Sequence, residues 1–131
     1  MIGLDTNVVV RYLTHDDPTQ TASAAEVMNS LTAEDPGFLS TVVIAELVWV
    51  LETCFNFSKP EVIETLERLL RSKELVLEGA ELAAQALNTF NASRSGFTDC
   101  LVERSGHAAG CRHTVTFDRR AANQPGMKLL S

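Results

Sequence analysis

Four carboxylates stand where a parallel sheet would gather acidic side chains: Asp5, Glu46, Asp99 and Asp118. Asp5 directly follows a short apolar segment, residues 2–4, and Asp118 ends the alternating segment 113–118, so both acids are predicted at the ends of strands. Ligands of open parallel sheets bind in the crevice beyond the carboxyl ends of the strands. The positions of these acids therefore predict a route for them to one crevice.

The chemistry that suits such a cluster is the binding of a divalent cation. Carboxylates that are brought together without counter-ions raise one another's pKa values and destabilise the fold. Hard cations such as Mg²⁺ and Mn²⁺ prefer an all-oxygen, carboxylate-rich site. A zinc site would need His or Cys at defined spacing, which His15, His107 and His113 do not offer. There is also no phosphate-cradling Gly-rich loop, which argues against nucleoside-triphosphate chemistry.

Each acid also has an ordinary structural explanation. Asp5 can cap a helix by accepting hydrogen bonds from the first free N–H groups. Glu46 can lie on the one exposed stripe of an otherwise buried helix, whereas a buried Glu46 would need a partner, a metal or a raised pKa. Asp99 suits the first turn of a helix, where the dipole favours an anion. Asp99 and Glu103 share a helix face and repel each other unless a cation lies near.

The hydrophobic pattern predicts alternating strands and helices. Strands are expected at residues 2–4, 38–39, 74–77 and 113–118, with a final edge strand at 127–130. Helix starts are marked by Asp17-Pro18 and by the capping-box pattern of Ser58 and Glu61. Helices are expected over residues 17–31, 41–54, 59–72, 82–90 and 97–109, with a further one starting near residue 8 and one helical turn at 121–122. The β-branched residues of the run 42–51 also allow a strand, but its length and its continuation to residue 54 favour a helix.

This alternation predicts one α/β domain, residues 1–131, with helices on both faces of a parallel sheet of four to five strands. The first strand is short and apolar and is followed by helices, so we expect it near the centre of the sheet. In the last long helix, Phe97, Leu101, Ala108 and Ala109 are expected to pack inward, and Gly110 to end the helix.

The composition is that of an ordinary soluble globular protein, with 45% hydrophobic residues and a mean hydropathy of +0.04. No apolar run approaches the ~20 residues that a membrane helix needs. There is no basic segment followed by a cleavage site, so we expect a cytoplasmic protein. Cys54, Cys100 and Cys111 lack the spacing of a disulfide framework or zinc knuckle, and are expected as buried small hydrophobic residues.

The net charge of −6 normally counts against a nucleic-acid partner, because phosphate neutralisation needs Lys and Arg. A metal that several acids share cancels their charge locally, so that only a local basic patch is required. The candidates are Arg11, Arg94, Arg104, Arg112, His113, Arg119 and Arg120. Each of these side chains, taken singly, is better explained as part of a solvated surface.

Taken together, the motifs resemble those of the PIN-domain nucleases, and in particular of VapC-type toxins from toxin–antitoxin pairs. The resemblance covers essentially the whole chain and rests on residues 4–7 (LDTN), 40–47 (STVVIAEL), 97–101 (FTDCL) and 114–119 (TVTFDR). It implies a three-layer α/β/α fold with sheet order 3-2-1-4-5, an acidic Mg²⁺ or Mn²⁺ site and endoribonuclease activity. It also implies a homodimer that is neutralised by a cognate antitoxin.

In that family the positions matching Asp5, Glu46, Asp99 and Asp118 form the acidic catalytic site, with Asn7 and Thr116 as supporting polar groups. By this resemblance Asp5, Asp99 and Asp118 are the candidate metal ligands. Glu46 and Asp118 would complete the shell or position the attacking water. One departure is that Glu103 and Arg104 follow the third acid, where small apolar residues are common. We interpret Glu103 as exposed, with an outer-shell ligand as the alternative.

Two other enzyme classes fit this sequence poorly. A haloacid-dehalogenase-like phosphatase needs a second Asp where Asn7 stands, and a receiver domain needs a late Lys near the pocket, where the chain has only Lys128. The stronger alternative is a catalytically weak PIN-like module that binds protein or RNA, in which the acids are mainly caps and surface groups. The presence of all four acids argues against it.

Overall fold

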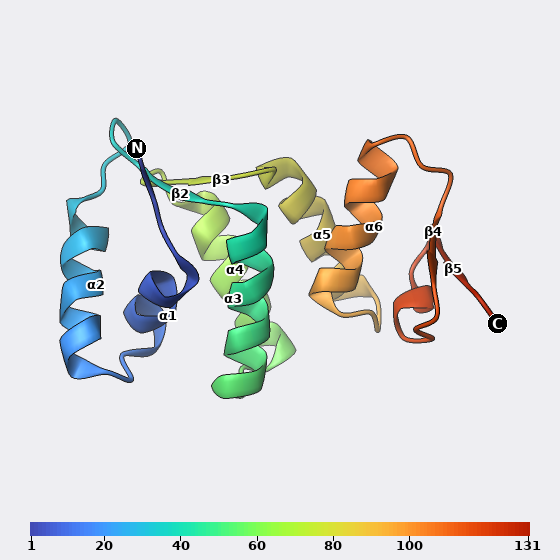
Figure 1. The fold of residues 1–131 in the computed structure, drawn as a ribbon, viewed down its shortest axis with the longest axis horizontal. Coiled ribbons are helices and arrows are strands. Elements are labelled where there is room, and N and C mark those ends of the chain that lie inside the picture. Colours follow the sequence, from blue (N-terminus) through green and yellow to red (C-terminus); the bar gives the residue numbers. More distant parts are fainter. The chain divides into compact units, whose positions relative to one another are not determined.

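The computed structural model describes residues 1–131, which form two compact units, unit 1 (Met1–Glu78) and unit 2 (Gly79–Ser131) (Figure 1). Unit 1 contains β1 (Ile2–Gly3), α1 (Thr6–Thr14), α2 (Pro18–Ser30), β2 (Gly37–Leu39), α3 (Thr41–Cys54), α4 (Lys59–Arg71) and β3 (Leu75–Leu77). Unit 2 contains α5 (Ala80–Ala92), α6 (Phe97–Ala108), β4 (Thr114–Thr116), the 3-10 turn η1 (Ala121–Asn123) and β5 (Met127–Leu129). The alternation of helices with short strands confirms the predicted α/β class.

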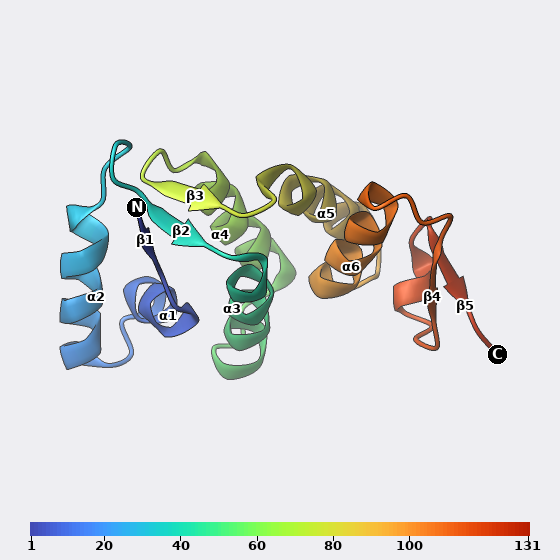
Figure 2. The same ribbon diagram turned by 45° about the horizontal axis from the view of Figure 1, so that its top comes forward.

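The sheet of unit 1 is parallel, and β2 lies between β1 and β3 (Figure 2). Parallel neighbours need a long crossover connection. The pair α1 and α2 supplies it between β1 and β2, and α3 and α4 supply it between β2 and β3. The prediction of a central first strand is wrong for this sheet, because β1 pairs on one side only and both its residues are exposed.

The helix starts of unit 1 follow the predicted capping signals. The Asp17 carboxylate accepts a hydrogen bond from the Gln20 N–H at 3.0 Å, with Pro18 as the first helical residue. In α4 the Ser58 hydroxyl accepts from the Glu61 N–H at 3.3 Å, and the Glu61 carboxylate accepts from the Ser58 N–H at 2.9 Å. Both predicted starts are confirmed.

The core of unit 1 is built on α3. Ile44, Leu47, Val48 and Leu51 are buried at the spacing of one helical face, which decides for a helix over a strand in this apolar run. Val62, Leu66 and Leu69 of α4 are buried as well.

In unit 2, α5 packs against α6. The rings of Phe90 and Phe97 meet edge to face with their centroids 6.0 Å apart, a favourable aromatic geometry. Phe97 and Leu101 are buried as predicted, but Ala108 and Ala109 are exposed. That part of the prediction is wrong because α6 ends at Ala108, and its last turn reaches beyond the packed residues.

The strands β4 and β5 form a separate parallel pair, in which Thr114 pairs with Met127 and Thr116 with Leu129. The prediction of one sheet of four to five strands in the order 3-2-1-4-5 is therefore wrong as a single sheet. The neighbours β3-β2-β1 and β4-β5 are found, but in two sheets. Alternation along the chain predicts that a segment is a strand, whereas its partner depends on distant segments that the local pattern does not encode.

No disulfide joins the three cysteines, and only Cys100 is buried. Cys54 and Cys111 are exposed, so the prediction of burial is wrong for both. Cys54 is the last residue of α3, and Cys111 follows the end of α6, so both lie at helix ends and not on a packed helix face. None of the helices combines the length and the apolar character needed to cross a bilayer.

Candidate active site

Asp5 stands at the carboxyl end of β1 and begins α1. Its Oδ1 accepts a hydrogen bond from the Thr6 N–H at 2.8 Å, which makes Asp5 the N-cap of the helix. The side chain is exposed, and its Oδ2 receives no hydrogen bond. The capping role is thus confirmed, and it leaves one carboxylate oxygen open to a ligand.

A second acid that the sequence analysis missed stands at the same edge of the sheet. The Leu4 N–H donates to the Phe38 carbonyl at 2.9 Å, so Asp5 and the N-cap of α3, Ser40, follow neighbouring strands in register. Glu78 follows β3 there, and its Oε1 accepts from the Thr41 N–H at 2.8 Å. Its sequence signal was a charge directly after an apolar strand, the same signal that singled out Asp5.

Glu46 lies on α3, roughly 9 Å beyond Ser40 along the helix axis at the rise of 1.5 Å per residue. It is exposed, as are Val42 and Trp49 on the same helical face. The exposed-stripe interpretation of Glu46 is therefore correct, and its carboxylate needs no buried partner. No Lys or Arg pairs with it.

In unit 2, Asp99 is the third residue of α6 and is half-buried. The N-cap residue, Gly96, provides no side-chain cap, and a Cβ added there would lie 3.4 Å from Asp99 Oδ2. No N–H or O–H of the protein donates to the Asp99 carboxylate, so both of its oxygens are open. Asp99 stands in the first turn of α6, where the helix dipole attracts an acidic side chain.

Asp118 lies after β4 in a turn held by hydrogen bonds. Its Oδ1 accepts from the N–H of Arg120 at 2.8 Å and of Ala121 at 3.3 Å. Its own N–H donates to Thr116 Oγ1 at 3.0 Å, which gives Thr116 a direct part in fixing the turn. The buried hydroxyl of Ser95 lies 3.1 Å from the Arg120 carbonyl. No local pattern pointed to Ser95, a serine within a polar loop.

Asn7, the other predicted supporting residue, is exposed on the first turn of α1. It lines a cavity of about 350 Å³ together with Arg11 and Gln20, and its side chain makes no hydrogen bond to Asp5. Beside it, Thr6 Oγ1 is buried without a hydrogen-bond partner. The polar groups around Asp5 in unit 1 thus form fewer hydrogen bonds than those around Asp118 in unit 2.

Glu103 is buried, so the interpretation of this residue as exposed is wrong. Its two carboxylate oxygens accept from Arg104 Nε at 2.7 Å and from a terminal guanidinium nitrogen at 2.9 Å. These hydrogen bonds raise the pKa of Arg104. The carboxylate also lies directly against Gly126. A paired guanidinium offsets the desolvation of a buried carboxylate, and Glu103 packs against Gly126, just before β5.

The four acids suit a hard divalent cation. Carboxylate oxygens are the ligands that Mg²⁺ and Mn²⁺ prefer, none of the four acids is neutralised by Lys or Arg, and each keeps at least one oxygen free of hydrogen bonds from the protein. Unit 1 holds Asp5 and Glu46, and unit 2 holds Asp99 and Asp118. Neither unit by itself gathers three Asp, Glu, His or Cys side chains in a metal-binding arrangement.

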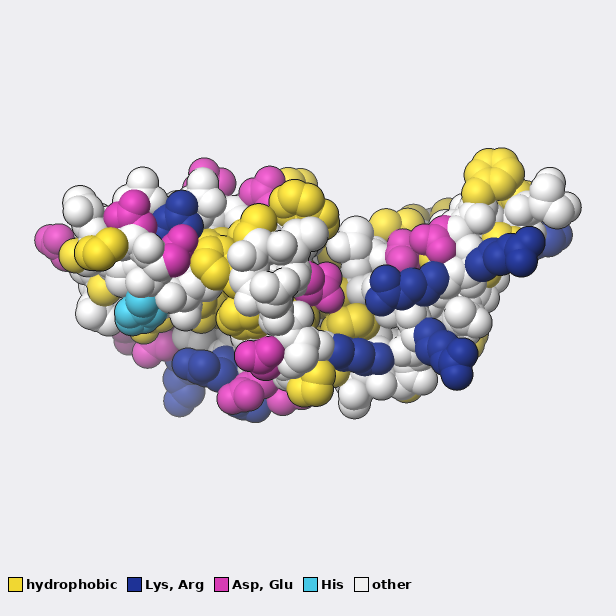
Figure 3. All heavy atoms as spheres, turned by 90° about the horizontal axis from the view of Figure 1, so that it is seen from below, with side chains coloured by type: hydrophobic (Ala, Val, Ile, Leu, Met, Phe, Trp, Pro, Cys, Tyr) yellow, Lys and Arg dark blue, Asp and Glu magenta, His cyan; other side chains and the backbone are white.

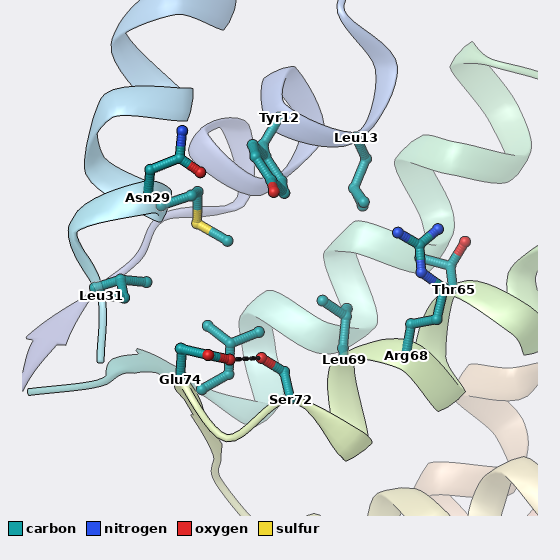
Figure 4. A pocket seen from close by; sticks show the side chains of 11 residues that line it. Tyr12, Leu13, Asn29, Leu31, Thr65, Arg68, Leu69, Ser72 and Glu74 are labelled. Carbon is teal, nitrogen blue, oxygen red and sulfur yellow. Dashed lines mark hydrogen bonds between the residues drawn. The ribbon is translucent and has the colours of Figure 1, made fainter. Parts of the chain in front are cut away.

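A cavity of about 390 Å³ in unit 1 is lined by none of these acids (Figure 4). Tyr12 of α1 and Asn29 of α2 lie on one side of it, and Arg68 of α4 lies on the other. Ser72 and Glu74 are joined there by a hydrogen bond of 2.9 Å. The four candidate acids therefore lie outside this cavity.

Comparisons with known proteins agree with these motifs. Residues 2–126 match the family described as PIN domain, a range that includes all four acids. The chain is also similar to a protein of Aquifex aeolicus (strain VF5) named VapC ribonuclease. The two sequences are 24% identical over 118 residues, which cover 89% of this chain and 87% of that protein.

Proposed function

Because the chain belongs to the PIN-domain family, we propose that it is a metal-dependent endoribonuclease that cleaves RNA phosphodiester bonds. We also propose that it acts as the toxin of a toxin–antitoxin pair in the cytoplasm. The observation that carries the proposal is the family match through residues 2–126, with two acids in each unit whose oxygens are open to a ligand. On this proposal, residues 1–131 act as a single PIN domain.

In this proposal Asp5, Asp99 and Asp118 would hold Mg²⁺ or Mn²⁺, and Glu46 would complete the shell or position the attacking water. The ion, when bound, lowers the pKa of water and offsets the charge of the phosphate. The backbone N–H groups of Arg120 and Ala121 fix Oδ1 of Asp118 and leave its Oδ2 for the ligand. Oriented ligands of this kind are characteristic of metal sites, whose neighbours hold them in place.

The remaining residues position the substrate and the water. Glu46, exposed and unpaired, is suited to orient the attacking water and to take its proton. Thr116 supports the Asp118 turn through the Asp118 N–H, and Asn7 is the polar group next to the Asp5 cap on α1. The reaction leaves the RNA chain cut at one phosphodiester.

The partners in this proposal are an RNA substrate, a cognate antitoxin and a second copy of the chain. The name of the Aquifex relative, VapC ribonuclease, supports the RNA substrate and the toxin role. Copurification with the product of an adjoining gene, together with the mass of the complex in solution, tests the antitoxin and the homodimer.

The experiment that tests the activity is cleavage of a mixed RNA by the purified chain with Mg²⁺ or Mn²⁺, with and without EDTA. We expect metal-dependent cleavage that Asp5→Asn abolishes, because Asn keeps the N-cap but not the charge. Glu26→Gln, an exposed acid without an ion pair, is the control and should leave cleavage intact. RNA binding without any cleavage by the wild type would favour the alternative of a catalytically weak binding module.

A further inference from the structure

A second cavity lies wholly within unit 2, between the end of α5 and the segment that follows η1. It has a volume of about 660 Å³ and is lined by Asn88, Thr89, Ala92, Ser93, Arg94, Asn123 and Pro125. Small-molecule pockets usually measure about 300–1,000 Å³, so the cavity is large enough for one nucleotide. Its polar lining consists of amides, hydroxyls and one guanidinium, without any carboxylate.

The charge of unit 2 differs from that of the whole chain. Unit 2 carries six basic residues against four acidic ones and has a net charge of +2, whereas the chain has −6. The basic residues are Arg94, Arg104, Arg112, Arg119, Arg120 and Lys128, and the acids are Glu81, Asp99, Glu103 and Asp118. Figure 3 shows Lys and Arg side chains gathered over the α5, α6 and β4–β5 part of one face. Such asymmetry between two parts of a chain indicates a polyanionic partner.

Only one acid of unit 2 forms an ion pair with this basic surface, Glu103 with Arg104. Asp99 and Asp118 form none and are the metal ligands of the proposed function. Arg94 is exposed, and its guanidinium forms no ion pair. The cavity therefore presents an unpaired cation to an anionic ligand.

The cavity is connected to Asp118 through one side chain. Arg120 Nε donates to the Arg94 carbonyl at 2.8 Å, and the Arg120 N–H donates to Asp118 Oδ1 at 2.8 Å. Arg120 thus links Arg94, the residue that would bind the ligand, to the turn that contains Asp118. The side-chain amides of Asn88 and Asn123 can both donate and accept, which suits the edge of an unpaired base.

We propose that this cavity holds one nucleotide of the single-stranded RNA substrate next to the bond that is cut. Arg94 binds its phosphate, and Asn88 and Asn123 contact its base. The inference rests on the proposed ribonuclease function and adds a binding subsite to it. In this subsite Arg94 contributes to the binding of RNA and takes no part in the cleavage step.

The test is binding of a short, fluorescein-labelled, random-sequence RNA to the full chain, measured by anisotropy. Asp99→Asn serves as the parent, in EDTA, so that the RNA is not cut. Arg94→Ala should raise Kd about tenfold, the loss of one charge-assisted hydrogen bond. Between about 50 and 200 mM salt it should also reduce the slope of log K against log salt by about 0.7, the value for one phosphate of a single strand.

Two matched variants make the result specific. Arg71→Ala removes the same charge from an exposed arginine of unit 1 and should change neither Kd nor the salt slope. Asn123→Ala should weaken binding without altering the salt slope, because it removes a base contact and not a phosphate contact. In the active chain, Arg94→Ala should raise KM and leave kcat unchanged.

The outcomes separate this inference from the function on which it rests. A parent that does not bind RNA overturns both. A parent that binds RNA, with Arg94→Ala equal to it in Kd and salt slope, overturns the subsite alone. Arg94-dependent binding of a fluorescein-labelled polyglutamate peptide in place of RNA would assign the cavity to an acidic polypeptide and overturn the inference as well.

Discussion

The hydroxyl of Ser95 lies 3.1 Å from the carbonyl oxygen of Arg120, at a position that is only 1% exposed. It also lies 3.2 Å from the carbonyl oxygen of Ala121. Asp118 Oδ1 accepts hydrogen bonds from the N–H groups of the same two residues. Ser95 and Asp118 therefore hold one turn at its carbonyls and at its amides, which couples a buried serine of the α5–α6 loop to a proposed metal ligand.

From this arrangement we predict that Ser95→Ala destabilises the chain by about 1–3 kcal/mol, the cost of leaving buried polar groups unpaired. Its affinity for Mn²⁺ should fall as well, because the Asp118 turn is less firmly held. Urea unfolding and Mn²⁺ titration measure the two effects. Ser105→Ala, at an exposed position of α6, is the control. Unchanged stability of Ser95→Ala would mean that its hydroxyl does not hold the turn.

A second prediction concerns the contact between Gly126 and the buried Glu103. Gly126 has φ of +92°, and a Cβ added there would overlap Glu103 Oε2 and lie 2.7 Å from Cδ. Gly110 has φ of +94° with nothing within 4 Å of the added Cβ. Both Ala variants pay the left-handed backbone penalty of about 1–2 kcal/mol, and only Gly126→Ala meets the carboxylate as well.

Gly126→Ala should consequently lower the melting temperature more than Gly110→Ala. Thermal unfolding of the two variants side by side measures the difference. Combining Gly126→Ala with Glu103→Ala should recover part of the extra loss, because the clashing carboxylate is gone. Equal melting temperatures for the two single variants would show that the Glu103 side chain moves aside freely.

The capping box of α4 gives a pH-dependent prediction. The hydrogen bonds from the Ser58 N–H and hydroxyl lower the pKa of Glu61 from its usual 4.5. A carboxyl group whose pKa is lower in the folded state stabilises the fold above its unfolded pKa, and this stability is lost as pH falls through the folded pKa. The wild type should therefore lose melting temperature on acidification below about pH 4.5 more steeply than Glu61→Gln does.

The control for this prediction is Glu64→Gln, on the same helix but outside the capping box. It should keep the acid sensitivity of the wild type. Parallel melting curves for the wild type and Glu61→Gln across this pH range would contradict a stabilising role for the ionised Glu61.

Features that depend on neighbours in the sequence were predictable. The capping box of Ser58 and Glu61 and the buried face of α3 follow from spacings of three and four residues. The division of the strands into two sheets did not follow, because β-pairing joins segments that are far apart in the chain. The exposed edge position of β1 was missed for the same reason, since a short apolar strand resembles a central one.

The candidate site shows the same division. The cap at Asp5 was a local signal, and so was the place of Asp99 in the first turn of α6. The burial of Glu103 depends on Gly126, and the bond from Thr41 to Glu78 joins residues 37 positions apart. Side chains of this kind are placed by tertiary packing, which periodicity does not describe.

The proposed function makes Asp5 and Asp99 ligands of a divalent ion. This claim is tested most directly by calorimetric titration of Mn²⁺ into the wild type, Asp5→Asn of unit 1 and Asp99→Asn of unit 2. We predict saturable binding by the wild type and at least a tenfold loss of affinity in both variants, since each removes one charged ligand. Wild-type affinity in either variant, or no binding by the wild type, would contradict the claim.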